Sequence, residues 1–398
     1  MATSERGVPD CHNCTVTTQD GHAATRDHLL ETALRGFSPP VIAPDKAAAY
    51  VQQRLGVDDA PVPGLIEFAL RLIGAEHHGP GEKVLWIAVF DYDGERYELA
   101  HAKFGVKLWV HTVKSEADAR KTLAQVVGKL RAASRIVEKM VLDGAGDTIK
   151  RGRVTVLNQH RQVREAYNYF RERAANPTHV DDVDQKGEGQ FGRWWSHTSG
   201  ANVMAMNSRH DFSAAVTAYF SVLEHDLVLS LAFSDFDPDH DDLTAFIGAR
   251  WGEKWKRLHG TRMPANRYFS DLSRVAERWR NPYAHGGFEK GHGATLFLHT
   301  EGIGALPVGM TRWTDSPRYS LYASIADDID DVFAFFDELD EWLRKTHAEA
   351  TEWIASGLPV RFDEQFRREV ALARKQGRFA RFLSKHERLQ DQHDNMDF

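Results

Sequence analysis

Residues 84–113 have the sequence VLWIAVFDYDGERYELAHAKFGVKLWVHTV, and this stretch decides the fold of the first half of the chain. It contains three runs enriched in aromatic and β-branched residues, and Asp93-Gly94 between the first two is a strong two-residue hairpin signal. We therefore predict a three-stranded antiparallel meander. A helix is expected next, because Ser115 and Asp118 have capping-box spacing and apolar residues then recur at helical spacing up to Gly144.

The chain before this meander is less regular. Residues 1–27 are polar without an apolar period and are expected to form a flexible tail. Prolines and glycines interrupt the following segment, in which 46–55 and 65–74 are the best candidates for short helices. Together with the meander and its helix, residues 28–153 are predicted to form a small α+β module.

After residue 153 the sequence becomes mainly helical. Residues 212–233 are apolar on nearly every side, with Asp211 as the expected N-cap, which is typical of a central helix in a bundle. Residues 294–313 have the pattern of a short hairpin inserted between helices, whereas 179–192 is acidic and contains glycine, as expected of a loop. The other helices predicted for a bundle over residues 154–358 are 157–175, 243–259, 267–280 and 323–354.

Composition limits the class of protein. A length of 398 residues suggests about two or three domains, and 42% hydrophobic with 27% charged residues is typical of a folded chain. The net charge of −7 excludes a uniformly basic nucleic-acid-binding protein, although local basic faces remain compatible with it. With two cysteines and the longest uncharged apolar run at 212–223, we expect a cytoplasmic protein without disulfides or a membrane segment.

Charge is unevenly distributed along the helical half. Residues 114–173 hold 14 Lys and Arg against 7 Asp and Glu, and the predicted helical tail over 359–398 is also basic between 361 and 388. Such stretches are either RNA-tracking faces or ordinary solvated surfaces. Residues 323–341 carry eight acidic side chains and no basic one, so RNA is not expected to follow this helix.

The segment 267–287 contains the residues with the clearest chemical meaning. Asn281 precedes Pro282 and is biased away from helical backbone, so we expect the helix to end or kink just after Arg280. A permanent cation then lies about one turn from His285, which titrates near neutral pH. A buried stripe on the same helix is predicted from the spacing i, i+4, i+7 and i+11 of Tyr268, Leu272, Val275 and Trp279.

The residues Arg280-Asn281-Pro282-Tyr283-Ala284-His285 resemble the R-x(4–6)-H signature of HEPN domains, including the polar residue that commonly follows the arginine. Arg278 also satisfies the spacing. HEPN domains are helical bundles, and many are metal-independent endoribonucleases that act as toxins or antiviral effectors in prokaryotes. The resemblance covers roughly residues 154–354. It implies RNA as substrate, no cofactor or metal, and a homodimer that brings two Arg/His pairs into one cleft.

RNA cleavage by its own 2′-hydroxyl calls for these residue types. His285 is the expected general acid or base, and Arg280 the expected phosphate clamp. Glu224 lies in the apolar central helix, where a carboxylate needs a partner, and Arg280 is a candidate; Asp226 matches the same role loosely. With Glu224 and Asn281 as orienting groups, the predicted function is a metal-independent endoribonuclease.

A purely structural interpretation uses the same residues. Arg280 and Glu224 then tie two helices together, His285 caps a turn, and the chain is a non-catalytic dimerisation or RNA- or ligand-binding module.

Cys11 and Cys14 resemble half a zinc site, but no second ligand pair has suitable spacing, so a flexible tail is favoured. Residues 235–242 resemble the start of a calcium loop without its glycine, so an exposed acidic loop is predicted.

Overall fold

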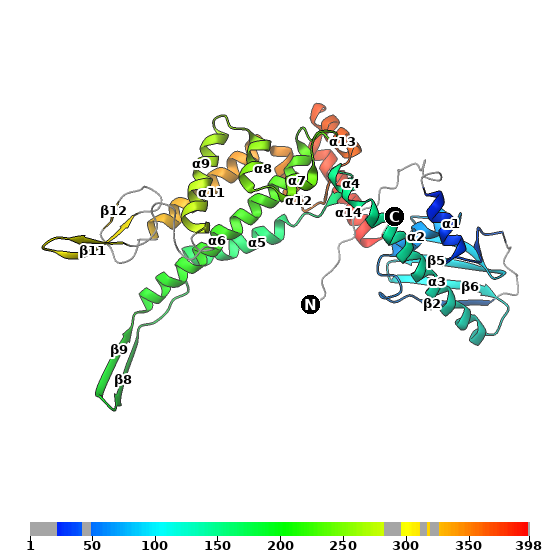
Figure 1. Cartoon of the computed structure of the whole chain (residues 1–398), viewed down its shortest axis with the longest axis horizontal. Helices are drawn as coiled ribbons and strands as arrows, with labels where there is room; N and C mark the ends of the chain where they lie inside the picture. The colour runs from blue at the N-terminus through cyan, green and yellow to red at the C-terminus, as the bar shows by residue number, and fades with distance from the viewer. Residues whose placement is uncertain (1–21, 42–48, 282–295, 311–316, 319–325, 397–398) are drawn as a thin grey trace. The chain divides into compact units, whose positions relative to one another are not determined.

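The computed structural model describes residues 22–41, 49–281, 296–310, 317–318 and 326–396. The chain divides into two compact units, Met1–Ile149 with Ala380–Phe398 and Lys150–Phe379 (Figure 1). The predicted α+β class is confirmed, with an antiparallel sheet in the first unit and mainly helices in the second. The segment 359–398, expected as one helical tail, contains a short strand and two helices in its described part, and it is divided: residues up to Phe379 belong to the second unit, and those from Ala380 to the first.

The predicted meander forms the centre of the first unit. Strands β4 (Val84–Tyr92), β5 (Glu95–Ala102) and β6 (Gly105–Thr112) pair in sequence order. Asp93 and Gly94 both have positive φ, 50° and 75°, as the tight turn between twisted strands requires. The sheet is completed by three shorter strands: β1 (Phe37–Ser38) and β3 (Glu76–His78), which pair with β4, and β2 (Ala49–Arg54), which pairs with β6.

Residues 46–55 were expected to be helical, and this is wrong over β2. Six residues of β2 pair antiparallel with β6, from Ala49 opposite Thr112 to Arg54 opposite Lys107. The partner strand is more than fifty residues away in sequence, so local helix propensity does not decide the outcome. The helix expected over 65–74 is confirmed as α2 (Pro63–Leu72).

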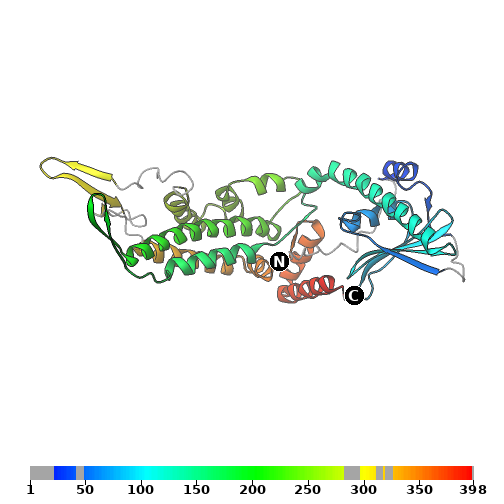
Figure 2. The same ribbon diagram turned by 90° about the horizontal axis from the view of Figure 1, so that it is seen from below.

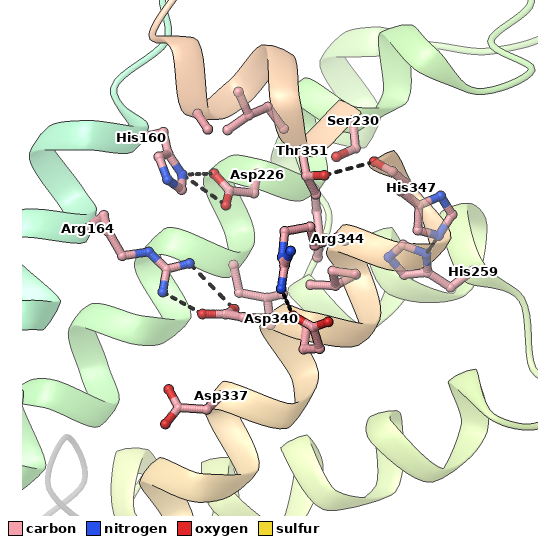
Figure 3. Close-up of a pocket in the computed structure, with 16 residues that line it drawn as sticks. His160, Arg164, Asp226, Ser230, His259, Asp337, Asp340, Arg344, His347 and Thr351 are labelled. Carbon is pink, nitrogen blue, oxygen red and sulfur yellow. Dashed lines mark hydrogen bonds and ion pairs between the residues drawn. The ribbon is translucent and has the colours of Figure 1, made fainter. Parts of the chain in front are cut away.

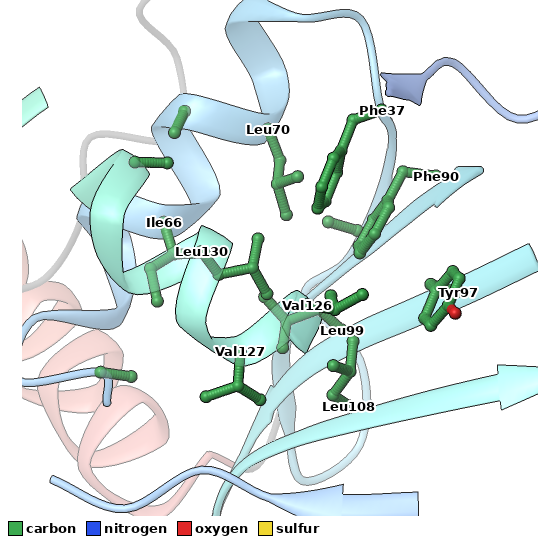
Figure 4. Close-up of a cluster of buried hydrophobic side chains, with 14 of the residues drawn as sticks. Phe37, Ile66, Leu70, Phe90, Tyr97, Leu99, Leu108, Val126, Val127 and Leu130 are labelled. Atoms are coloured by element: carbon green, nitrogen blue, oxygen red, sulfur yellow. The ribbon is translucent and has the colours of Figure 1, made fainter. Parts of the chain in front are cut away.

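Helices cover one face of this sheet and close its core. They are α1 (Ala23–Glu31), which begins within the expected tail, α2, and α3 (Glu116–Asp143). The Ser115 side chain accepts a hydrogen bond from the Asp118 backbone N–H and Gly144 follows the last turn of α3, as predicted. Figure 4 shows the buried side chains between helices and sheet, which include Phe37, Ile66, Leu70, Phe90, Leu99, Leu108, Val126 and Leu130.

The second unit is a helical bundle around α6 (Gly200–Ser230), which lies beside α5 (His160–Ala175) (Figure 2). Its core is rich in aromatic rings, among them Tyr219 stacked on Phe336 at 3.7 Å. Around α6 are α8 (Trp251–His259), α9 (Ala265–Val275), α11 (Ala326–Thr346) and α12 (Ala348–Ser356). The smaller elements of this unit are β7 (Thr155–Val156), η1 (Leu231–Phe233), α7 (Leu243–Gly248), β13 (Val360–Arg361) and α13 (Glu364–Lys375), whereas α4 (Ala145–Lys150) and α14 (Phe379–Asn395) fall almost wholly in the first unit.

Two hairpins extend from the bundle (Figure 1). The hairpin predicted within 294–313 is confirmed as β10 (Leu296–Thr300) and β11 (Gly304–Met310). A short third strand, β12 (Pro317–Arg318), pairs with β11. A second hairpin, β8 (Val183–Gly189) with β9 (Gly192–Thr198), corrects the loop expected over 179–192. Nearly all residues of this hairpin are exposed, and neither face is buried. Its sequence therefore does not show the alternation of apolar and polar residues by which most strands are predicted.

The central helix begins earlier than expected. α6 starts at Gly200, so Asp211 is an interior residue that pairs with Arg173 instead of an N-cap. The helix Gly200–Phe233 is long and apolar enough to cross a membrane by length and composition, and 56% of its apolar window is buried inside the protein. A core helix of a soluble protein passes the same test.

Candidate functional site

The candidate site lies where α9 changes its hydrogen-bonding pattern. After Val275 the helix continues as the π-helical turn η2 (Ala276–Arg280), a feature that often accompanies functional positions. The predicted stripe is confirmed, since Tyr268, Leu272, Val275 and Trp279 are all buried. These four anchors fix the direction in which Arg280 leaves the helix.

The helix is expected to end or kink just after Arg280, but the residues that follow Asn281 lie outside those that the structure describes. Asn281 keeps helical backbone angles of φ −68° and ψ −43°, and the distortion precedes it, in η2. The bias against helical backbone before a proline is a preference, and buried contacts such as those of Trp279 outweigh it here. Arg280 therefore projects from a widened helical turn and not from a loop.

Arg280 and Glu224 meet across two elements, as the sequence suggested. Nη2 of Arg280 donates to Oε1 of Glu224 at 3.2 Å, which joins η2 to α6. The guanidinium also lies over the ring of Phe220, 5.0 Å from its centroid and one turn before Glu224 on α6. The two side chains are 32% and 33% exposed, so the pair is open to a solute.

The other predicted site residues have different outcomes. Asn281 is exposed, beside Arg280 in the chain. His285 lies outside the described residues, as do Cys11 and Cys14. Asp226, the alternative to Glu224, faces another direction and contacts His160 Nδ1 at 2.8 Å. Of the four residues proposed from the sequence, the structure thus brings Glu224 and Arg280 together.

Lys254 is a further charged residue of this site that the sequence analysis did not identify. It lies on α8 and is only 4% exposed. Burial lowers the pKa of Lys254, and Glu224 acts in the opposite direction. The sequence does indicate the burial of Lys254, because this residue follows Trp251 by three positions and precedes Leu258 by four. This spacing places it on the same side of α8 as these two apolar residues.

No family model, curated protein or solved structure matches this chain. The residues of the site are therefore interpreted from their own geometry and from the resemblance of the motif at Arg280.

Across 22–41, 49–281, 296–310, 317–318 and 326–396, no group of three or more His, Cys, Asp or Glu side chains is placed to hold a metal ion. In the acidic loop 235–242, Asp235 and Asp241 both pair with Arg257.

A separate pocket of about 360 Å³ opens between α5, α6, α11 and α12 (Figure 3). On its wall Arg164 donates to Asp340 at 2.7 Å, and the buried hydroxyl of Tyr219 donates to the same carboxylate at 2.8 Å. The His160 and Asp226 contact forms another part of the wall, and leucine side chains supply apolar surface. A pocket of this size and mixed lining suits a small organic molecule.

Two histidines close one end of this pocket. His259 Nδ1 and His347 Nε2 are 2.8 Å apart, so they share one hydrogen and cannot both be charged without repulsion. Burial first, and then charge repulsion from His347, lowers the pKa of His259 to about 3. Burial and then Arg374 lower the pKa of His347. Both rings are therefore neutral near pH 7.

Proposed function

We propose that this chain is a metal-independent endoribonuclease of the HEPN type. The proposal rests on the contact of Arg280 with Glu224, because it places a partly exposed guanidinium at the start of the Arg280–His285 motif and gives it an orienting carboxylate. An arginine that served only to tie helices would be expected to lie deeper in the interface. One third of each side chain is instead accessible to a substrate.

Each residue has a role in transesterification. His285 removes the proton from the 2′-hydroxyl or delivers one to the 5′-oxygen, worth about 10²- to 10⁴-fold in rate. Arg280 donates two hydrogen bonds to the phosphorane, and loss of such a donor typically costs about 10²- to 10³-fold. Glu224 orients Arg280, and Asn281 supplies a further polar contact beside it. The products are a 2′,3′-cyclic phosphate and a 5′-hydroxyl.

The resemblance to HEPN nucleases also suggests partners and setting. One motif supplies one histidine, so a homodimer that joins two Arg/His pairs is proposed, acting in the cytoplasm as a toxin or antiviral effector. Light scattering should give the mass of a dimer. A strictly monomeric protein that still cleaves RNA would contradict the shared cleft.

The decisive experiment is incubation of the purified full chain with total RNA in EDTA. We expect cleavage that leaves 2′,3′-cyclic phosphate ends and that is lost in His285→Ala. Activity that disappears in EDTA and returns with Mg²⁺ would contradict the metal-independent mechanism. Equal cleavage by His285→Ala would show that the motif is not the active centre.

The pocket lined by His160 and Arg164 favours a second candidate function. A cavity of about 360 Å³ with polar walls and an apolar floor is suited to a ligand, so the chain is alternatively a non-catalytic HEPN-like module for dimerisation or for RNA or ligand binding. Wild-type protein that binds RNA in a gel-shift assay, with no cleavage under any metal condition, would favour this alternative.

A further inference from the structure

The β8 and β9 hairpin has two free edges. It extends from the bundle as a sheet of its own, and every residue of β9 is exposed (Figure 1). Among the residues that the structure describes, each of its strands pairs only with the other, so each leaves one row of backbone N–H and C=O groups for a further strand. A sheet of two strands is marginally stable in water, and a free edge is a template for pairing. The hairpin is therefore suited to a partner that adds strands to it.

The two edges differ in their side chains. Acidic and basic residues alternate along β8 at Asp184, Lys186 and Glu188, which is one way in which native proteins protect an edge from pairing. β9 has the sequence GRWWSHT, without a lysine or a carboxylate, and both of its tryptophans are exposed. The edge of β9 is thus the one left open to another strand.

The two indoles are held in different ways. Trp194 lies against the backbone of Gly187 on β8, where a side chain in place of the glycine would come within 2.6 Å of the ring. Trp195 points to the other face, because successive side chains of a strand alternate. Its ring stacks along β9 on His197, with centroids 6.0 Å apart. The indole of Trp195 therefore stays beside the free edge.

Charge identifies the occupant of this edge. The basic side chains of β9 already have carboxylate partners on β8, since Arg193 pairs with Glu188 at 2.7 Å and His197 contacts Asp184 at 2.8 Å. With Lys186, residues 183–198 hold two basic and two acidic residues, whereas the whole chain carries a charge of −7. A hairpin without net charge does not attract RNA phosphates or anionic lipids. A second copy of this chain can approach here without the charge repulsion expected elsewhere.

We propose that β9 pairs antiparallel with β9 of a second copy, so that two hairpins form one four-stranded sheet around a two-fold axis. Such an interface uses the same surface of both copies, as in most homodimers. With the axis at Trp194, Arg193 lies opposite Trp195 of the partner subunit, and this cation–π contact is made twice. An axis at Trp195 would instead place Arg193 opposite His197 of the partner subunit, another basic side chain. Charge therefore favours the axis at Trp194.

The inference goes beyond the proposed nuclease. It involves no residue of the Arg280 and Glu224 site, and it holds for a catalytic or a non-catalytic chain. It also assigns the dimer to a surface that the resemblance to HEPN domains does not imply.

The test measures the dimer dissociation constant of the full chain by sedimentation velocity over a dilution series. Trp195→Lys should raise this constant about tenfold or more, because it removes the indole and places a lysine opposite Arg193 of the partner subunit. Trp195→Glu removes the same indole but places an anion opposite that arginine. It should therefore dimerise about fivefold or more tightly than Trp195→Lys.

A second substitution isolates the contact between copies. Lys186 lies directly opposite Trp195 within the same hairpin and would respond to the new charge. Both variants are therefore made together with Lys186→Gln. Lys186→Gln alone changes the protected edge and should stay within about twofold of the wild-type dissociation constant. All of these side chains are exposed, so the thermal melts should remain unchanged.

Three results overturn the proposal. They are a wild type that is monomeric at every concentration, a dimer whose dissociation constant is unaffected by Trp195→Lys, and a lysine variant that dimerises as tightly as the glutamate variant. A monomeric wild type that binds a 2′-O-methyl RNA oligonucleotide or phosphatidylcholine vesicles, with binding lost in Trp195→Glu, would identify RNA or lipid as the occupant instead. RNA cleavage is assayed separately. A monomer that cleaves RNA refutes the pairing of hairpins and not the nuclease, whereas a Trp195-dependent dimer without cleavage does the reverse.

Discussion

Two regions of the helical unit join neighbouring helices through an arginine and a carboxylate, and they differ in the further contacts that these side chains make. Around Asp340, one carboxylate accepts from Arg164 and from the buried hydroxyl of Tyr219. Around Glu224, the carboxylate accepts from Arg280 at 3.2 Å, and the guanidinium of Arg280 also lies over the ring of Phe220. The carboxylate of the first region therefore also binds a buried hydroxyl, whereas in the second region the second contact is made by the arginine.

This difference separates a structural contact from an adaptable one. The Asp340 contacts join α5, α6 and α11 and include a hydroxyl that has lost water completely. Removal of the Asp340 carboxylate therefore leaves the buried Tyr219 hydroxyl without its carboxylate acceptor. The Arg280 side chain remains one-third exposed and makes a single contact with the Glu224 carboxylate, so it can exchange that carboxylate for another anion. Stability should be sensitive to the first region and ligand binding to the second.

The largest expected effect is on the first region. Asp340→Ala removes the carboxylate that Arg164 and the buried Tyr219 hydroxyl share, leaves that hydroxyl only the Phe336 carbonyl at 3.5 Å, and should lower the free energy of unfolding by about 2 to 3 kcal/mol. Urea denaturation measures it. The matched control is Asp337→Ala, one turn earlier on α11, where the carboxylate is 56% exposed and pairs with Arg171. That variant should lose at most about 1 kcal/mol; equal losses would contradict the distinction.

Acid should weaken the same region through its histidine pair. The pKa of His259 is about 3 when folded, so the unfolded chain binds a proton that the folded chain does not once the pH falls below about 6.5. The contribution of His259 therefore leaves the free energy of unfolding unchanged above this pH and lowers it below this pH, by up to about 1.4 kcal/mol per pH unit.

His259→Gln removes this titration, so the difference in unfolding free energy between pH 6.5 and pH 5 should shrink by about 2 kcal/mol. Urea denaturation at both pH values provides the comparison. An unchanged difference in the variant would mean that His259 is not the group responsible.

The smallest expected change in stability is at Glu224. Glu224→Gln keeps a hydrogen-bond acceptor at a site one-third exposed, so the loss should be about 1 kcal/mol or less, whereas turnover on RNA should fall about tenfold or more. A thermal melt and a cleavage assay measure the two quantities. A loss of about 3 to 5 kcal/mol would instead identify Glu224 as a buried structural tie. An unchanged melt together with wild-type cleavage would remove it from the site.

Local sequence signals account for the parts of the fold that were predicted correctly. The Asp93-Gly94 turn, the Ser115 cap and the apolar stripe of α9 each depend on residues close together in the chain. The pairing of Glu224 with Arg280 was also predicted, because a lone carboxylate on an apolar helix has few available partners.

The features that were missed depend on distant residues. β2 forms because β6 offers a free edge, and the exposed β8 and β9 hairpin lacks apolar alternation. Lys254 resembles a surface lysine until the neighbouring helices cover it. The pocket is likewise lined by residues of five helices from different parts of the sequence, so no single segment of the sequence predicts it.

The β8 and β9 hairpin gives the protein a built-in optical reporter. Trp194 and Trp195 are 50% and 62% exposed, whereas Trp255, Trp279 and Trp353 are buried. Iodide or acrylamide should therefore quench the red-shifted emission of the hairpin indoles first, while the buried indoles still fluoresce. Any molecule that settles on this hairpin would protect that fraction of the signal without disturbing the light emitted from the core.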